Sequence, residues 1–101
     1  MDRSKVAYLI TEENFQNPDG TWDRELKERK VYVNRSSVTG TEWFEGARTG
    51  INPDCRVTMF RPDYHGETIL ELDGRQYSVY RTYETDNDEI ELYVEKRMGT
   101  S

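Results

Sequence analysis

The clearest alternation of hydrophobic and polar positions lies near the C-terminal end of the chain. Ile90, Leu92 and Val94 alternate with charged or tyrosine positions over residues 89–95, the period expected of a half-buried β-strand. Residues 77–83 alternate in the same way, and a shorter apolar run precedes them at 69–72. Asp73-Gly74 separates two of these runs, and the polar cluster 84–88 separates the others. Asp-Gly between two such runs is typical of a hairpin turn. Residues 68–97 are therefore predicted to form a three-stranded meander.

The N-terminal half predicts further strands. Residues 6–12 alternate as a strand, 17–20 (Asn-Pro-Asp-Gly) form a long turn, and 55–60 form another strand that ends at the Pro- and Gly-containing loop 61–66. Residues 21–34 end in Val-Tyr-Val, although their charged middle could be mistaken for a helix. We interpret them as an exposed strand that forms a hairpin with the first one.

Residues 36–53 interrupt this β pattern with helix signals. Thr39 and Glu42 have the spacing of a capping box, Gly50 stands where a left-handed C-terminal cap is expected, and Pro53 follows. Gly46 lies inside the segment and weakens a helix by about 1 kcal/mol relative to Ala. The expected fold is therefore all-β: one domain over residues 1–101, a small barrel of about six strands, with a long loop at about 36–53 that carries a short helix.

The composition adds expectations about the core and the partners. Hydrophobic residues make up 34% of the 101 residues, and twelve residues are aromatic, so we expect a thin core that is largely aromatic and a chain that gains stability from neighbours. The net charge of −6 disfavours attraction to DNA but suits a channel wall that DNA slides past. A single cysteine fits a reducing compartment, and the short apolar run at 6–10 predicts neither a signal sequence nor a membrane anchor.

The sequence offers little chemistry of an enzyme. His65 is the only histidine and follows a turn signal, which favours a surface position. Cys55 has no histidine nearby in the sequence, and acidic neighbours raise a thiol pKa, so a structural role is favoured. Residues 86–89 lack the spacing of a calcium loop. We expect no enzymatic activity, no catalytic residue, no metal site and no cofactor.

Trp43 and Phe44 are the most distinctive pair. Because they are adjacent in the predicted helix, both cannot face one core. Either one of them plugs an end of the barrel while the other is partly covered, or one anchors a neighbouring subunit. Both roles can hold together.

The order of these segments resembles a known family. A strand hairpin is followed by Glu-Trp-Phe-Glu-Gly-Ala-Arg-Thr-Gly (42–50), then Arg-Val-Thr-Met-Phe (56–60), then Asp-Gly-Arg-Gln-Tyr-Ser-Val-Tyr-Arg-Thr-Tyr-Glu (73–84), and finally Ile-Glu-Leu-Tyr-Val-Glu-Lys (90–96). This pattern resembles the head-closure proteins of tailed bacteriophages, also called head-tail joining or stopper proteins, over residues 5–96.

The resemblance implies a structural role in the neck of a virion. Such proteins form a ring, typically of twelve copies, below the portal and adaptor; the ring docks the tail terminator or tail tube, and its loops close the channel on packaged DNA. No membrane partner is implied, and the expected location is the virion neck, with assembly in the host cytoplasm. The implied interface and gating residues are Thr41, Glu42, Trp43, Phe44, Glu45, Arg48 and Thr49. The implied ring contacts at hairpin tips are Asn17, Asp19, Asp86 and Asn87.

Two alternatives remain open at this stage. One is another neck or tail-completion component with the same small-barrel architecture. The other is a module that resembles an oligonucleotide-binding barrel and stacks single-stranded bases on Tyr and Trp side chains, which removal of Tyr80 or Tyr93 would test. The aromatic content permits the second alternative, whereas the negative charge argues against it.

Overall fold

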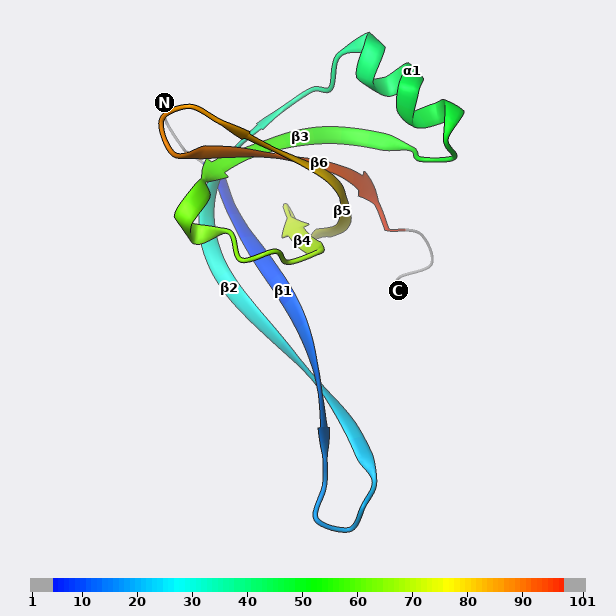
Figure 1. Ribbon diagram of the computed structural model, residues 1–101, viewed down its shortest axis with the longest axis vertical. Helices are drawn as coiled ribbons and strands as arrows, with labels where there is room; N and C mark the ends of the chain where they lie inside the picture. The colour runs from blue at the N-terminus through cyan, green and yellow to red at the C-terminus, as the bar shows by residue number, and fades with distance from the viewer. Residues whose placement is uncertain (1–4, 98–101) are drawn as a thin grey trace.

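Six antiparallel strands close into a barrel in the computed structural model, which describes residues 5–97 (Figure 1). The strands follow the order β1-β2-β3-β6-β5-β4, and β4 pairs with β1 to close the ring. Their bounds are β1 (Lys5–Gln16), β2 (Trp22–Ser36), β3 (Pro53–Phe60), β4 (Ile69–Leu72), β5 (Arg75–Thr85) and β6 (Glu89–Lys96). One helix, α1 (Gly40–Arg48), lies between β2 and β3, and a 3₁₀ turn, η1 (Arg61–Asp63), follows β3. The predicted all-β barrel with a helix-bearing loop is confirmed.

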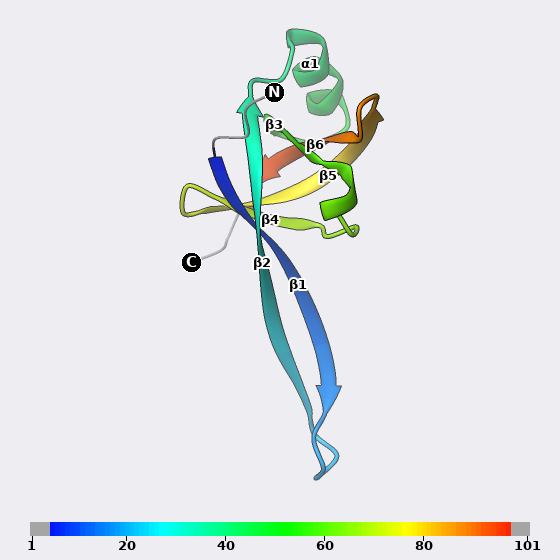
Figure 2. The ribbon, with the colours of Figure 1, turned by 90° about the vertical axis from the view of Figure 1, so that its left-hand side faces the viewer.

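The hairpin of β1 and β2 is much longer than the barrel. The two strands pair without interruption from Lys5 and Val33 to Gln16 and Trp22, but β1 contacts β4 only between Ala7 and Ile10. Residues 11–28, which we call the arm, therefore project beyond the barrel as a twisted two-stranded ribbon (Figures 1 and 2). All of them except Asn17 are exposed. The predicted first strand, 6–12, was too short, because its outer part has no core contact to mark it.

The barrel interior is aliphatic, and the prediction of a largely aromatic core was wrong. Leu9, Leu70 and Leu92 are fully buried at its centre, and Tyr77 is the only aromatic residue of the central cluster. Eight of the twelve aromatic side chains are instead exposed. The apolar side chains of β-branched residues, leucine and methionine fill the narrow interior of a six-stranded barrel better than wide rings do. The aromatic side chains are therefore mostly a property of the surface.

The turns of the meander follow the sequence. Asp73 and Gly74 join β4 to β5 with φ angles of 53° and 77°, the left-handed conformations of a tight hairpin turn. Asn87 and Asp88 join β5 to β6 with φ angles of 66° and 58°. Asn and Asp tolerate these angles better than other side chains do. The predicted meander over 68–97 is thus present as β4, β5 and β6.

Helix α1 begins and ends at the predicted signals. Thr39 is the N-cap, and its hydroxyl accepts a hydrogen bond from the Glu42 amide at 3.1 Å. At the other end Gly50 has φ 84°, its amide donates to the Ala47 carbonyl, and the Ile51 amide donates to the Gly46 carbonyl. These two bonds form a Schellman motif, which only a residue with a left-handed backbone can complete without strain.

Gly46 has a role that its helix propensity hides. A Cβ atom on Gly46 would lie 2.4 Å from Cγ of Pro53, the first residue of β3. The absence of a side chain therefore lets α1 approach the start of β3 closely. Glycine lowers the intrinsic stability of the helix, but it allows this close contact between α1 and β3.

Candidate assembly surfaces

The predicted interface segment lies on the outside of the barrel. Helix α1 sits beside the outer side of β3 and away from the arm (Figure 1). Trp43 is 49% exposed and Phe44 is 64% exposed, and their rings meet edge to face at 6.3 Å. Neither ring is in the core, so of the two alternatives the structure does not favour the one in which a ring plugs the barrel. Two large apolar side chains are left in solvent on one short helix.

The other predicted residues of this segment have distinct positions. Thr41, Glu45 and Arg48 are exposed, and Arg48 pairs with Glu45 at 3.6 Å along the helix. The Thr49 hydroxyl donates to the Gly46 carbonyl at 2.9 Å and so helps to end the helix.

Glu42 holds α1 against the barrel. Tyr80 of β5 donates its hydroxyl hydrogen to Glu42 Oε1 at 3.0 Å, and Arg81 Nη2 lies 3.1 Å from Glu42 Oε2. The Glu42 side chain is only 16% exposed. The capping box was therefore only half correct: Thr39 caps the Glu42 amide, but the Glu42 carboxylate turns to β5 instead of returning to the N-cap.

Glu42 belongs to a chain of polar contacts on the outer face of β5, β6 and β3. Tyr80 sits at a register shift between Val79 and Arg81, a bulge that directs its ring toward α1. The Arg81 guanidinium lies over the Tyr93 ring at 4.1 Å. Burial, followed by the hydrogen bond to Glu42, raises the pKa of Tyr80 well above its usual value. The phenol therefore stays protonated and remains a donor.

The polar chain continues toward β3. Tyr93 donates its hydroxyl hydrogen to Glu91 at 2.8 Å, and Arg56 lies 3.7 Å from the same carboxylate while donating to Ser36 at 3.0 Å. Sequence reasoning missed this network. Its key pair, Glu42 and Tyr80, is 38 residues apart, and no local pattern marks it.

The two tyrosines considered for base stacking are not open platforms. Tyr93 is 8% exposed and Arg81 covers its ring, while Tyr80 is bound to Glu42. Stacking of a base needs a free ring face. Base stacking on these two tyrosines is therefore disfavoured, whereas the rings of Trp22 and Trp43 are exposed.

The predicted hairpin tips lie on distant parts of the molecule. Asn17 and Asp19 form the tip of the arm, whereas Asp86 and Asn87 form the turn between β5 and β6 on the barrel (Figures 1 and 2). Local hydrogen bonds shape the arm tip: Asp19 accepts hydrogen bonds from the Thr21 hydroxyl at 2.6 Å and the Thr21 amide at 3.0 Å, which lower the pKa of Asp19. The two tips can contact different neighbours, but not one common site.

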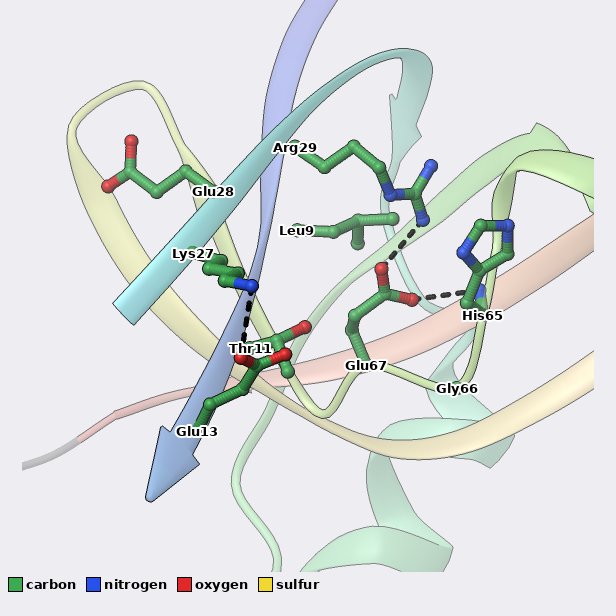
Figure 3. Close-up of a pocket in the computed structure, with 9 residues that line it drawn as sticks. All are labelled: Leu9, Thr11, Glu13, Lys27, Glu28, Arg29, His65, Gly66 and Glu67. Atoms are coloured by element: carbon green, nitrogen blue, oxygen red, sulfur yellow. Dashed lines mark hydrogen bonds and ion pairs between the residues drawn. The ribbon is translucent and has the colours of Figure 1, made fainter. Parts of the chain in front are cut away.

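A groove of about 480 Å³ opens where the arm leaves the barrel (Figure 3). Glu67 closes one side: its carboxylate binds Arg29 at 2.6 Å and accepts the His65 amide at 2.8 Å. Across the groove, Lys27 pairs with Glu13 at 3.0 Å. Burial disfavours the charge of Glu67, but the hydrogen bonds from Arg29 and from backbone amides outweigh it, so the pKa of Glu67 is lowered. The ion pair between Glu67 and Arg29 therefore links the loop before β4 to β2 at the base of the arm.

The remaining candidates have the positions that the sequence suggested. His65 is exposed, and Cys55 is buried in the core, where burial raises the pKa of its thiol against the opposing effect of Arg35. Within residues 5–97, no group of three or more His, Cys, Asp or Glu side chains is arranged to hold a metal ion. Over the same residues, no helix is both long and apolar enough to cross a membrane.

Comparison with known proteins assigns the chain to no family. No protein-family model matches the chain, and no curated protein matches it.

Proposed function

We propose that this chain is a structural protein of a phage virion neck, which forms a homo-oligomeric ring, of the twelve copies that the resemblance implies, below the portal and adaptor. In this proposal the ring receives the tail on its other side and closes the channel that holds packaged DNA. The chain acts through contacts with its neighbours and not by catalysis.

The observation that carries this proposal is the position of the exposed aromatic side chains. Four of the eight exposed aromatic side chains, both tryptophans among them, lie on the two elements that project from the barrel, the arm and α1: Trp22 at 69%, Phe44 at 64%, Trp43 at 49% and Phe15 at 42% exposure. Clustered apolar side chains in solvent mark surfaces that another protein covers. Tryptophan and phenylalanine in such positions are typical anchors of protein interfaces.

The construction of α1 supports its role as the element that closes the channel. The helix has nine residues and enters and leaves through the loops around Thr39 and Gly50. It contacts the barrel mainly through Glu42 and through Gly46 against Pro53. A short element with few buried contacts changes position more easily than the barrel strands do.

The decisive experiment is to locate the chain in an image reconstruction of an intact virion neck. The expected result is a ring on the portal axis between the adaptor and the tail, with α1 directed toward the lumen or a neighbouring copy. A position remote from the portal axis, or a single copy in the particle, contradicts the proposal. A ring at the tail end of the neck would instead identify a tail-completion component.

A second experiment tests the closing role directly. Residues 40–50 are replaced by a short Gly-Ser linker, and the DNA content of filled heads is measured before tails attach. The proposal expects heads that assemble but lose their DNA. Normal DNA retention by these heads contradicts the closing role of α1 while leaving the ring proposal intact.

A further inference from the structure

One face of the hairpin of β1 and β2 carries exposed apolar side chains both at the barrel and on the arm, with charged side chains between them. Ala7 and Leu9 of β1 point into the barrel, so the even-numbered residues of β1 and their partners in β2 share the opposite face. We call this opposite face of the hairpin its outer face. Its exposed apolar members are Tyr8, Tyr32, Leu26 and Trp22.

These four side chains divide into two groups. Tyr8 and Tyr32 lie on the part of the hairpin that forms the barrel wall, residues 5–10 and 29–36, which we call the basal half. Leu26 and Trp22 lie on the arm, at 55% and 69% exposure. The other face of the arm carries only one large apolar side chain, Phe15, next to the Lys27–Glu13 ion pair.

The two halves of the hairpin carry opposite charge. The arm has six acidic and two basic residues, a net charge of −4. The basal half has four basic residues and no acidic one, a net charge of +4. Lys5, Arg29 and Arg35 of the basal half pair with carboxylates of their own chain.

Lys30 is the basal cation left on the outer face. It lies over the Tyr32 ring at 5.4 Å, and among residues 5–97 no carboxylate is within ion-pair distance of it. On the same face of the arm, Glu12 is held only by Arg24 at 3.7 Å, with both side chains well exposed. Exposed pairs of this kind contribute little to the stability of one chain and are easily exchanged.

We propose that the outer face of the arm packs against the outer face of the basal half in a second copy of the chain. The two apolar side chains of the arm then cover the two basal tyrosines, and Glu12 lies next to Lys30. This inference rests on the self-association that the proposed function requires, and it names the surface that produces it.

The charges select this partner over two others. Arm-to-arm packing brings together two segments of net charge −4, which repel each other. A nucleic acid would also meet the acidic arm unfavourably. A second copy offers Lys30, the one basal cation on the outer face, together with an apolar surface of the same kind. Because each copy has one arm and one basal half, the contact either closes in a two-fold pair or passes from copy to copy into a ring.

The test measures self-association by sedimentation equilibrium for two matched substitutions. Trp22→Ser removes the most exposed ring of the outer face, and Phe15→Ser removes the large apolar side chain of the other face. The inference expects Trp22→Ser to weaken association about thirtyfold, the change that about 2 kcal/mol produces, and Phe15→Ser to weaken it by less than about threefold. Both positions lie on the arm, outside the core, so the melting temperature should stay unchanged in each variant.

A charge exchange tests the orientation of the contact. Lys30→Glu and Glu12→Lys should each weaken association, and the double variant should recover most of the loss. The matched control exchanges Lys27 and Glu13 on the other face, where association should be unaffected. Equal effects of Trp22→Ser and Phe15→Ser, or no recovery in the double variant, overturn the inference.

The outcomes separate this inference from the proposed function. A Trp22→Ser protein that keeps the wild-type oligomer overturns the contact but leaves the neck ring standing. A wild-type chain that associates through this face but is absent from the neck leaves the contact standing and overturns the proposed function. A wild-type chain that is monomeric both in solution and in the particle overturns both.

Discussion

Gly46 shows how a single missing side chain positions a whole element. Its Cα faces the Pro53 ring, and a methyl group there would lie 2.4 Å from Pro53 Cγ. Pro53 opens β3 and is itself buried, so its ring has little room to retreat. The contact makes this residue a fixed point between α1 and the barrel.

Gly46→Ala should therefore destabilise the protein although alanine is the better helix former. The gain in propensity is about 1 kcal/mol, whereas overpacking costs typically 1–3 kcal/mol, and the severity of this clash favours a net loss of about 1–2 kcal/mol. Denaturant unfolding measures the difference. Gly40→Ala is the matched control, because a Cβ on Gly40 meets nothing within 4 Å. A Gly46→Ala protein as stable as the control would show that α1 does not press on Pro53.

Glu67 gives the stability of the arm base a dependence on pH. Its pKa is lowered from the ordinary 4.5, because hydrogen bonds to its charged form outweigh burial. Its stabilising contribution is therefore fully present above about pH 4.5 and is lost as the pH falls through the lowered folded-state pKa.

Glu67→Gln should be less stable than the wild type by roughly 1–2 kcal/mol at neutral pH, since hydrogen bonds to a charged group are lost or weakened. The difference should shrink once the pH falls below about 4.5. Thermal unfolding across this range measures it. Glu28→Gln changes an exposed carboxylate in the same groove and serves as the control. A difference that is independent of pH would contradict the assigned role of the ionised carboxylate.

At the scale of elements, α1 is attached to the barrel through Glu42. Its carboxylate joins the helix to two adjacent residues of β5, and the capping role that the sequence suggested is left to Thr39 alone. The attachment is polar and lies near the surface.

Glu42→Ala should loosen α1 while leaving the barrel intact. Loss of two charge-assisted bonds of roughly 1.5 kcal/mol or more should increase amide exchange in α1 at least about tenfold. Hydrogen exchange with mass spectrometry measures this, and the amides of β3 and β6 should be unaffected. Glu45→Ala is the control, because Glu45 pairs only with Arg48 of the same helix. Equal exchange in the two variants would contradict the attachment through Glu42.

The elements of this fold were predictable where local chemistry defines them. The alternation at 89–95, the Asp73-Gly74 turn and the Thr39 cap all act within a few residues, and each has the predicted structure. The outer arm lacks such a signal, because strands exposed on both faces need no alternation.

Long-range partners were not predictable in the same way. The Glu42 carboxylate chooses between its own N-cap and Tyr80, and the choice depends on the bulge that brings Tyr80 under the helix. The prediction of an aromatic core rested on composition alone. Composition does not show that the barrel interior is filled by aliphatic side chains such as Leu9 and Leu92.

The whole molecule divides into a barrel that folds around its core and an arm that contributes nothing to that core. All residues of the central hydrophobic cluster lie outside residues 11–28. The molecule extends 51 × 31 × 22 Å, and the arm accounts for its elongation (Figure 2).

Replacing residues 12–26 by Asn-Gly should therefore leave a folded barrel that no longer self-associates. Asn-Gly favours the tight turn that would join the shortened strands. Circular dichroism and thermal unfolding should show a melting temperature close to that of the wild type, while sedimentation should show a monomer. An unfolded product would show that the barrel depends on the arm.

The closed barrel also determines where this protein is open to strand pairing. In the barrel each strand has a neighbour on both sides, but β1 after Ile10 and β2 before Val33 each have one free hydrogen-bonding edge. Free edges recruit other strands, and natural proteins guard them with charged side chains. The acidic residues of the arm supply such a guard. Near the isoelectric point of about 4.8 the net charge of the chain vanishes and repulsion between copies is weakest, so the same ribbon that serves ordered assembly becomes a template for disordered β aggregation.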